Sequence, residues 1–261
     1  MEQTKENKMG VMPVNKLLVT MSLPIVISML IQAMYNLVDS VFVAQINPDA
    51  LTAVGMAFPM QSLMIAFQTG LGVGMNALVS RYLGQKKPYE AGLAATHALI
   101  LTALNYVIFL IVGLTAIPAF FSIQTHSEII AGYGVEYLSI VCCGSLGLFF
   151  QIYGERILQA TGKTLLSMVS QILGAVINIV LDPVFIFGVD FLGIPAMGVT
   201  GAAIATVTGQ IIAAAVICLA VAFIAERCPP QSIQGAFQDF CIAVYLRCLW
   251  DFSFSFSDRK M

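Results

Sequence analysis

The sequence predicts an all-α membrane protein built on a bundle of six transmembrane helices. Of its 261 residues, 59% are hydrophobic and 10% are charged, whereas soluble domains carry about a quarter charged residues. A spanning helix needs about 20 mostly apolar residues, and apolar residues surround every helical face in six runs. These runs lie at approximately 17–44, 51–79, 91–118, 130–153, 164–189 and 196–225.

Basic residues fall only in alternate joints between these runs. The joints at 45–50, 119–129 and 190–195 contain no Lys or Arg. By the positive-inside rule, the N-terminus and every second joint are therefore cytoplasmic, in a multi-pass protein of a bacterial-type cell membrane. The basic residues concerned are Lys5, Lys8, Lys16, Arg81, Lys86, Lys87, Arg156, Lys163 and Arg227.

The chain divides into three parts. Residues 1–16 form a cytoplasmic N-terminal segment and residues 17–225 form the six-helix transmembrane lobe. The character changes after residue 225, where two prolines precede a stretch that ends in alternating Phe and Ser. We expect residues 226–261 to be a poorly ordered cytoplasmic tail.

Two carboxylates lie inside apolar runs, Asp39 in the first and Asp182 in the fifth. An ionised carboxylate at the centre of a spanning helix costs about 2.5–3.5 kcal/mol, so its presence suggests a function. Residues 17–80 and 164–226 contain no Lys, Arg or His, so a bound proton or metal cation is the expected counter-charge. The alternative is that each aspartate is a protonated, hydrogen-bonded core residue or lies near the membrane interface.

Polar side chains share a helical face with each aspartate. Gln32 and Asn36 precede Asp39, and Asn178 lies four residues before Asp182. Oxygen atoms of carboxylates, amides and hydroxyls are hard ligands that suit sodium. The sequence therefore predicts an oxygen-rich cation or proton site.

Two prolines inside the apolar runs each leave one backbone carbonyl without its helical hydrogen-bond partner. Pro183 has no N–H for the carbonyl of Ile179, and Pro24 has none for the carbonyl of Thr20. Interrupted helices with free carbonyls are typical of ion sites in transporters.

No enzyme site, cofactor site or nucleic-acid site is predicted. His97 and His126 stand alone, and the six cysteines form no CxxC pair. No Ser/His/Asp or Cys/His arrangement is suggested, and the basic residues are too scattered to bind nucleic acid. Gly70, Gly72 and Gly74 lie inside an apolar run, where glycines usually allow close helix packing.

A series of short motifs resembles the multidrug and toxic compound extrusion (MATE) transporters over about residues 10–224. In order, the motifs are Pro24, Gln32-Ala33-Met34-Tyr35-Asn36-Leu37-Val38-Asp39, Gly84-Gln85, Gln159-Ala160-Thr161-Gly162, Asn178 to Asp182-Pro183, and Gly198-Val199-Thr200-Gly201-Ala202-Ala203. The resemblance implies that this six-helix bundle corresponds to one lobe of a twelve-helix transporter. Such transporters export bulky organic compounds, often cations, in exchange for sodium ions or protons.

The resemblance also implies roles for individual residues. The cation or proton site, and the metal site if sodium is the coupling ion, would consist of Asp39, Asn178, Asp182 and Thr200. The substrate cavity would include Gln32, Tyr35 and Asn36, and the first helix would bend at Pro24. Partners would be the lipid bilayer, small organic substrates, and a second lobe or a second copy of the chain.

Three alternatives remain open at this point. A lipid-linked oligosaccharide flippase of the same superfamily would carry several basic residues in its cavity, and the predicted spans contain none there. An intramembrane aspartyl protease would place one aspartate in a GxGD motif, which neither Asp39 nor Asp182 has. The third is a non-functional truncated or frameshifted fragment, which the abrupt change near residue 225 favours over a half-size homodimer.

Overall fold

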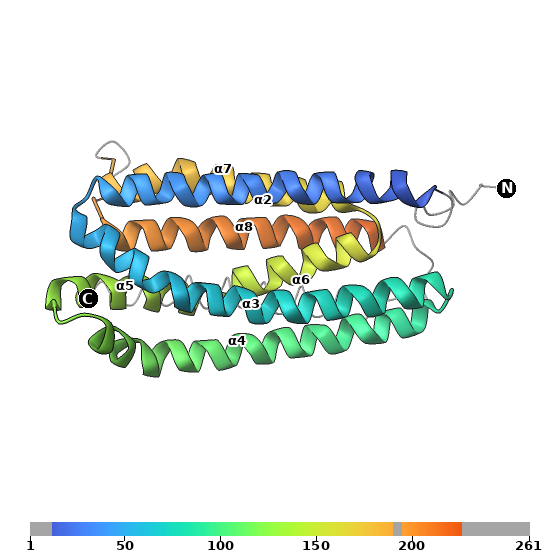
Figure 1. Cartoon of the computed structure of the whole chain (residues 1–261), viewed down its shortest axis with the longest axis horizontal. Helices are drawn as coiled ribbons and strands as arrows, with labels where there is room; N and C mark the ends of the chain where they lie inside the picture. Colours follow the sequence, from blue (N-terminus) through green and yellow to red (C-terminus); the bar gives the residue numbers. More distant parts are fainter. Residues whose placement is uncertain (1–11, 190–194, 226–261) are drawn as a thin grey trace.

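The computed structural model describes residues 12–189 and 195–225, and these form an antiparallel bundle of helices (Figure 1). Within these ranges the helices are α2 (Val14–Ala44), α3 (Pro48–Gly84), α4 (Pro88–Gln124), α5 (Glu128–Gly144), α6 (Leu146–Ala160), α7 (Thr164–Phe187) and α8 (Val199–Ala225). Residues 1–11 and the tail predicted at 226–261 lie outside the described residues.

The all-α, six-span prediction is confirmed. Five of the described helices are long and apolar enough to cross a membrane. The sixth span is the pair α5 and α6, which meet at an angle of 47°. Several helices extend a few residues beyond the apolar runs, because their ends continue through polar residues such as Ser80 and Arg81 near the end of α3.

The bend between α5 and α6 was not predicted. The fourth apolar run was expected to be one helix over 130–153, but the helix is interrupted at Ser145. The hydroxyl of Ser145 donates to the carbonyl of Cys142 at 2.7 Å and so satisfies one backbone group at the break. The second half also continues to Ala160, which places Arg156 inside α6 and not in the joint where it was expected.

The centre of the bundle is α8, which packs against α5, α6 and α7. Small residues bring α7 and α8 close together. A Cβ added at Gly209 would lie only 3.0 Å from the carbonyl oxygen of Gly174. A Cβ added at Gly174 would lie 2.9 Å from the Cβ of Ala213. Close approach through small residues is the usual way in which membrane helices pack.

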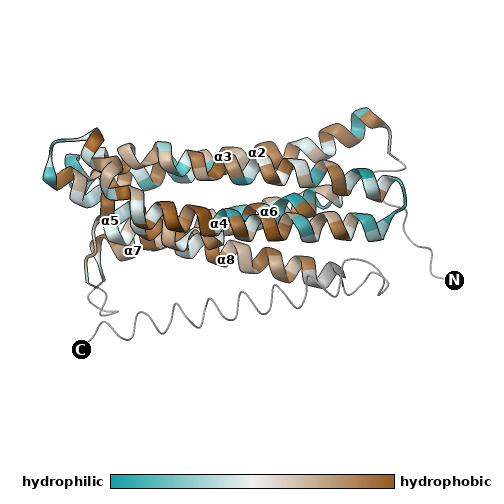
Figure 2. Cartoon of the chain, turned by 90° about the horizontal axis from the view of Figure 1, so that it is seen from below, coloured by the Kyte–Doolittle hydropathy of each residue, from teal (hydrophilic) through white to brown (hydrophobic). Residues whose placement is uncertain are grey.

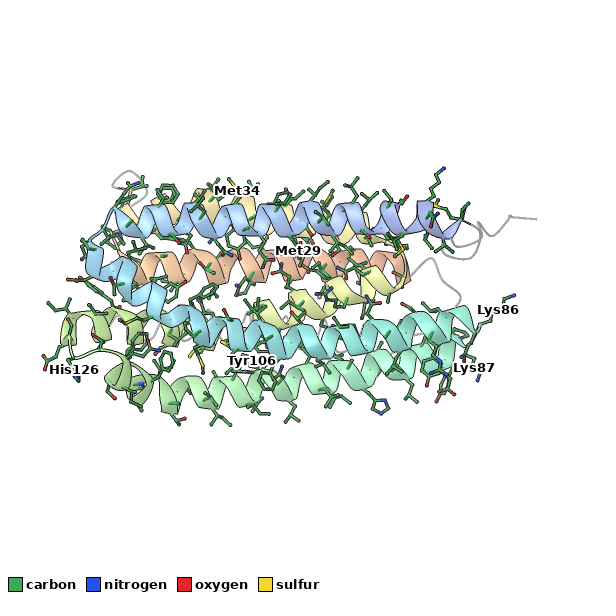
Figure 3. The ribbon with its side chains drawn as sticks, viewed as in Figure 1. Met29, Met34, Lys86, Lys87, Tyr106 and His126 are labelled. Carbon is green, nitrogen blue, oxygen red and sulfur yellow. The ribbon has the colours of Figure 1, made fainter. Side chains whose placement is uncertain are left out.

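The outside of the bundle is apolar, as a lipid-facing surface requires. Hydrophobic residues predominate along the length of the helices and hydrophilic residues gather toward the two ends (Figure 2). Met34 on α2 is 58% exposed and points away from the bundle (Figure 3). Lys86 and Lys87 lie at the same end as the start of α2, whereas His126 lies at the opposite end.

Candidate functional site

A cavity of about 460 Å³, called here the first cavity, lies between α2, α3, α6, α7 and α8. Small-molecule sites typically have volumes of about 300–1,000 Å³. The polar side chains that line it are Ser28, Gln32, Tyr35, Asn36, Ser62, Thr69, Gln151, Glu155, Arg156, Gln171, Asn178, Thr206 and Gln210.

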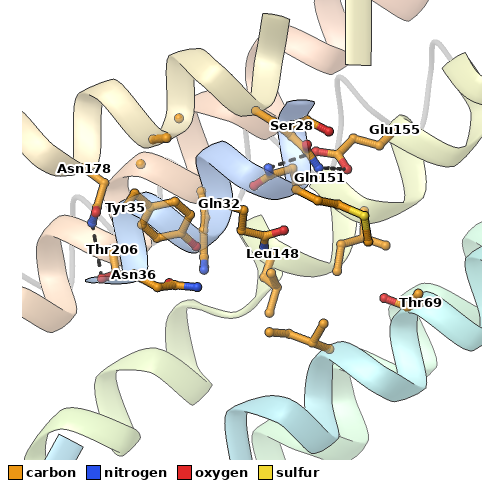
Figure 4. Close-up of a pocket in the computed structure, with 18 of the residues that line it drawn as sticks. Ser28, Gln32, Tyr35, Asn36, Thr69, Leu148, Gln151, Glu155, Asn178 and Thr206 are labelled. Atoms are coloured by element: carbon orange, nitrogen blue, oxygen red, sulfur yellow. Dashed lines mark hydrogen bonds between the residues drawn. The ribbon is translucent and has the colours of Figure 1, made fainter. Parts of the chain in front are cut away.

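A second cavity of about 390 Å³ adjoins the first. It is lined by residues of α2, α3, α5, α6 and α8, among them Asp39 and Tyr137. Gln32, Tyr35 and Asn36 line both cavities, so the structure places the three predicted substrate residues at the boundary between them (Figure 4).

The two predicted aspartates come from neighbouring helices at the same level of the bundle. α2 and α7 run in the same direction and pack against each other. Asp39 lies five residues before the end of α2 at Ala44, and Asp182 lies five residues before the end of α7 at Phe187. The two carboxylates, far apart in the sequence, therefore lie at corresponding levels of two helices that pack against each other.

Asn178 connects Asp182 to α8. Its amide nitrogen lies 3.3 Å from Asp182 Oδ1. The same nitrogen lies 3.3 Å from Thr206 Oγ1 (Figure 4). With the amide turned over, the nitrogen donates to Asp182 Oδ2 at 3.3 Å and the oxygen accepts from the Thr206 backbone N–H at 3.2 Å. In either orientation Asn178 donates to Asp182, as the spacing of four residues predicted.

Asp39 and Asp182 differ in their surroundings. Asp182 is fully buried and hydrogen-bonded, and it lines neither cavity. Asp39 is 9% exposed and lines the second cavity, and its Oδ1 atom has no hydrogen-bond partner among the described residues. A buried, unpartnered carboxylate oxygen beside amide oxygens fits a proton or a hard cation such as sodium.

Thr200 makes a different contact from the other three predicted cation ligands. Its hydroxyl donates to Glu136 Oε1 of α5 at 2.6 Å, and it lines neither cavity. In this conformation the structure therefore does not direct the Thr200 hydroxyl to Asp39 or Asp182. Pro24 is buried in the interior of α2, which is one continuous helix from Val14 to Ala44.

A second charged cluster on α6 was missed by the sequence reasoning. Glu155 is 4% exposed and lines the first cavity together with Arg156. Glu155 Oε1 accepts from Gln151 Nε2 at 3.0 Å, and Oε2 accepts from Gln171 Nε2 at 2.6 Å. The spacing of four between Gln151 and Glu155 was a usable signal, but the apolar run was taken to end at 153 and Arg156 was assigned to the following joint.

The prediction that no basic residue lines the cavity was wrong, because Arg156 lines it. The predicted spans contained no basic residue that would face a substrate, but α6 carries Arg156 into the lining of the first cavity. The reason is the extra helical turn beyond residue 153. One arginine next to Glu155 is less than the several basic residues expected of a flippase for lipid-linked sugars.

The described residues contain no group of three or more His, Cys, Asp or Glu side chains that would hold a metal ion. The predicted ion site, Asp39, Asn178, Asp182 and Thr200, would instead offer two carboxylates, an amide and a hydroxyl. This ligand set suits alkali cations or protons rather than transition metals.

A six-span helical bundle around a polar cavity with buried carboxylates is the architecture of one lobe of a secondary transporter. The MatE family model matches residues 24–184. The chain belongs to the MATE family of transporters, as the motifs in the sequence predicted.

Relatives and solved structures agree with this assignment. The chain is 28% identical over 201 residues to an FAD transporter of Shewanella oneidensis, covering 77% of this chain and 44% of that protein. It is 27% identical over 201 residues to the multidrug export protein MepA of Staphylococcus haemolyticus, covering 76% of this chain and 43% of that protein. A MOP superfamily transporter from Pyrococcus furiosus superposes with a TM-score of 0.77 at 32% identity, covering 85% of this chain and 48% of that one.

The chain thus spans less than half the length of these relatives. The solved transporter is matched over 48% of its chain, which agrees with a chain that corresponds to one lobe of a two-lobed protein.

Proposed function

We propose that this chain is one lobe of a secondary antiporter that exports organic compounds, often cations, in exchange for sodium ions or protons. The observation that carries the proposal is the position of Asp39. It lines a cavity large enough for a small molecule, and one of its oxygen atoms is buried without a partner among the described residues. Its helix, α2, packs against α7, which carries Asp182.

In this proposal the ion site consists of Asp39, Asn178, Asp182 and Thr200. Sodium or a proton is a co-substrate that neutralises the two carboxylates. Asp182 accepts a hydrogen bond from Asn178, whereas Asp39 lines the second cavity. Asp39 is therefore the residue through which ion binding changes substrate affinity, and substrate binding changes ion affinity. Thr200 joins the site when its hydroxyl leaves Glu136.

The substrate binds in the joined cavities at Gln32, Tyr35 and Asn36, which border both of them. Because these residues and Asp39 lie on the same helix, a change in α2 on ion binding alters the substrate site directly. We propose that α2 bends at Pro24 in this step. An ion shifts the conformational equilibrium only by its difference in affinity for the two states.

The names of the relatives agree with an export function. MepA is a multidrug export protein and the Shewanella relative is an FAD transporter, so both carry organic molecules. Alternating access requires two lobes that move against each other around the site. We therefore propose that the active unit contains a second six-helix lobe or a second copy of this chain, in the cell membrane with the N-terminus in the cytoplasm.

The flippase alternative has less support. Arg156 is the basic side chain that lines the first cavity, and it lies next to Glu155 in α6. A pyrophosphate group carries more negative charge than one arginine would balance.

Efflux of ethidium from cells that express the chain tests the proposal, with sodium and pH varied independently. We expect efflux to follow one of the two ion gradients, and Asp39→Asn to lower the rate at least tenfold, because a neutral amide has no negative charge for the ion to neutralise and cannot take up the proton. Asp49→Asn is the matched control, since Asp49 is exposed in the first turn of α3. Equal, ion-dependent efflux by wild type and Asp39→Asn would overturn the proposed site.

A further inference from the structure

The start of α8 is joined to α5 by a hydrogen bond between two side chains. The hydroxyl of Thr200, the second residue of α8, donates to Oε1 of Glu136, which lies two turns after the start of α5. The two oxygen atoms are 2.6 Å apart, within the range of about 2.5–2.7 Å that a hydroxyl makes with an ionised carboxylate. Such bonds are about twice as strong as those between neutral groups, so Glu136 is a strong partner for this hydroxyl.

The backbone around Thr200, in contrast, is held by α7. The N–H of Met197 donates to the carbonyl of Phe185 at 3.0 Å, and a Cβ added at Gly201 would clash with the same carbonyl group. Phe185 lies three residues after Asp182 and therefore on the same face of α7. These contacts keep Thr200 within about one helical turn of the level of Asp182.

A rotation of the Thr200 side chain is enough to change the partner of its hydroxyl. α8 packs against both α5 and α7, and a threonine on a helix divides between two χ1 rotamers. One rotamer directs the hydroxyl to Glu136 on α5, as in this structure. A different rotamer takes the hydroxyl away from Glu136, on a backbone that α7 holds beside Asp182.

A sodium ion at Asp182 would need the same hydroxyl. Hard cations are bound by several oxygen atoms at once, and Asp182 is fully buried with Asn178 as a hydrogen-bond partner. In the predicted set of ligands, Thr200 supplies the hydroxyl oxygen. Because one rotamer cannot serve both Glu136 and an ion at Asp182, sodium binding breaks the bond to Glu136, and the free energy of that bond is subtracted from the sodium affinity.

We propose that Glu136 is a positioning residue that competes with sodium for the hydroxyl of Thr200 and thereby lowers the affinity of the ion site. The inference rests on the proposed function, because it takes Asp39, Asn178, Asp182 and Thr200 as the site and sodium as the ion. It assigns to α5 a control over an ion site whose ligands lie on α2, α7 and α8. A purely electrostatic role for Glu136 predicts the opposite sign, since removal of a nearby negative charge weakens the binding of a cation.

The melting temperature of the purified full chain in lipid nanodiscs measures sodium binding. An ion that binds the folded protein stabilises it increasingly as its concentration exceeds its Kd. Sodium chloride is exchanged for potassium chloride at constant ionic strength and pH, and the sodium Kd is obtained from the concentration dependence. We expect sodium to stabilise the wild type and not Asp39→Asn.

Variants at both ends of the hydrogen bond assign the competition. Glu136→Gln should lower the sodium Kd about tenfold, because a neutral acceptor holds the hydroxyl less strongly, and Glu136→Ala should lower it at least as far. Thr200→Val should raise the sodium Kd about tenfold, and Glu136→Gln added to Thr200→Val should then have no further effect. The matched control is Glu128→Gln, an exposed glutamate in the first turn of the same helix, which should leave the sodium Kd unchanged.

The outcomes distinguish this inference from the proposed function. A sodium Kd that is unchanged or higher in Glu136→Gln overturns the inference, including the case in which only the melting temperature in potassium falls, which would give Glu136 a structural role. An equal fall in Glu128→Gln, a fall that persists in the Thr200→Val background, or an unchanged Kd in Thr200→Val also overturns it. A wild type that sodium does not stabilise overturns the inference and leaves proton-coupled export standing. Sodium stabilisation that is unchanged in Asp39→Asn contradicts the proposed ion site as well.

Discussion

At the scale of single residues, Asn178 is the contact that joins the buried acid of α7 to α8. Its amide reaches Asp182 and Thr206 at 3.3 Å each. Removal of a buried hydrogen-bond partner leaves the other groups unsatisfied, which costs about 1–3 kcal/mol. Asn178→Ala is therefore expected to lower the free energy of unfolding by this amount, as measured by thermal unfolding in detergent.

Asp182→Ala provides the matched second variant, because Asn178 donates to Asp182 in either orientation of its amide. We expect the effects of Asn178→Ala and Asp182→Ala not to be additive, because each removes the same contact. The double variant should then be less destabilised than the sum of the two single variants. Strict additivity would show that the two side chains act independently and would contradict the network.

The sequence predicted Asp39 and Asp182 because a carboxylate in an apolar run is costly and therefore conspicuous. It also predicted the Asn178–Asp182 contact, since residues four apart share a helical face. It missed Glu155 and Arg156 because charged residues near the end of an apolar run are usual in joints. The contact between Thr200 and Glu136 joins residues 64 positions apart, which no local pattern encodes.

At the scale of helices, the close contact of α7 and α8 depends on small residues. A Cβ at Gly174 would lie 2.9 Å from the Ala213 Cβ, so a larger side chain must push the two helices apart. Gly174→Leu is expected to lower the free energy of unfolding by about 1–3 kcal/mol. The same shift would displace Asn178, one turn further along α7.

Gly70→Leu is the control for this prediction. Gly70 is exposed, and an added Cβ there would have no atom within 4 Å. We expect this variant to be as stable as the wild type or slightly more stable, because Leu favours the helix by about 0.8 kcal/mol over Gly. Equal melting temperatures for Gly174→Leu and Gly70→Leu would contradict the close packing of α7 and α8.

The number and order of the spans could be predicted because each apolar run and each charged joint is a local feature. The bend of 47° at Ser145 was missed, because the run from 130 to 153 is apolar on both sides of it and was taken as one continuous helix. Which glycines allow close packing also could not be predicted from the sequence. Gly72 packs against Arg156, whereas an added Cβ at Gly70 or Gly74 would have no atom within 4 Å.

At the scale of the whole molecule, α2 carries both the substrate residues and Asp39, so ion and substrate affinities should be linked. Linkage is reciprocal: if the ion lowers the affinity for the substrate, the substrate lowers the affinity for the ion by the same factor. The lobe alone contains both sets of residues, and this linkage can therefore be measured on the chain without transport.

The most direct measurement is the affinity of the purified chain in nanodiscs for rhodamine 123, with sodium varied at constant pH and pH varied at constant sodium. We predict that the affinity falls about tenfold when the coupling ion reaches a tenfold excess over its own Kd, and that the other ion has no effect. Asp39→Asn should abolish this dependence and Asp49→Asn should preserve it. An affinity for rhodamine 123 that is independent of both sodium and pH in the wild type would contradict ion-coupled export.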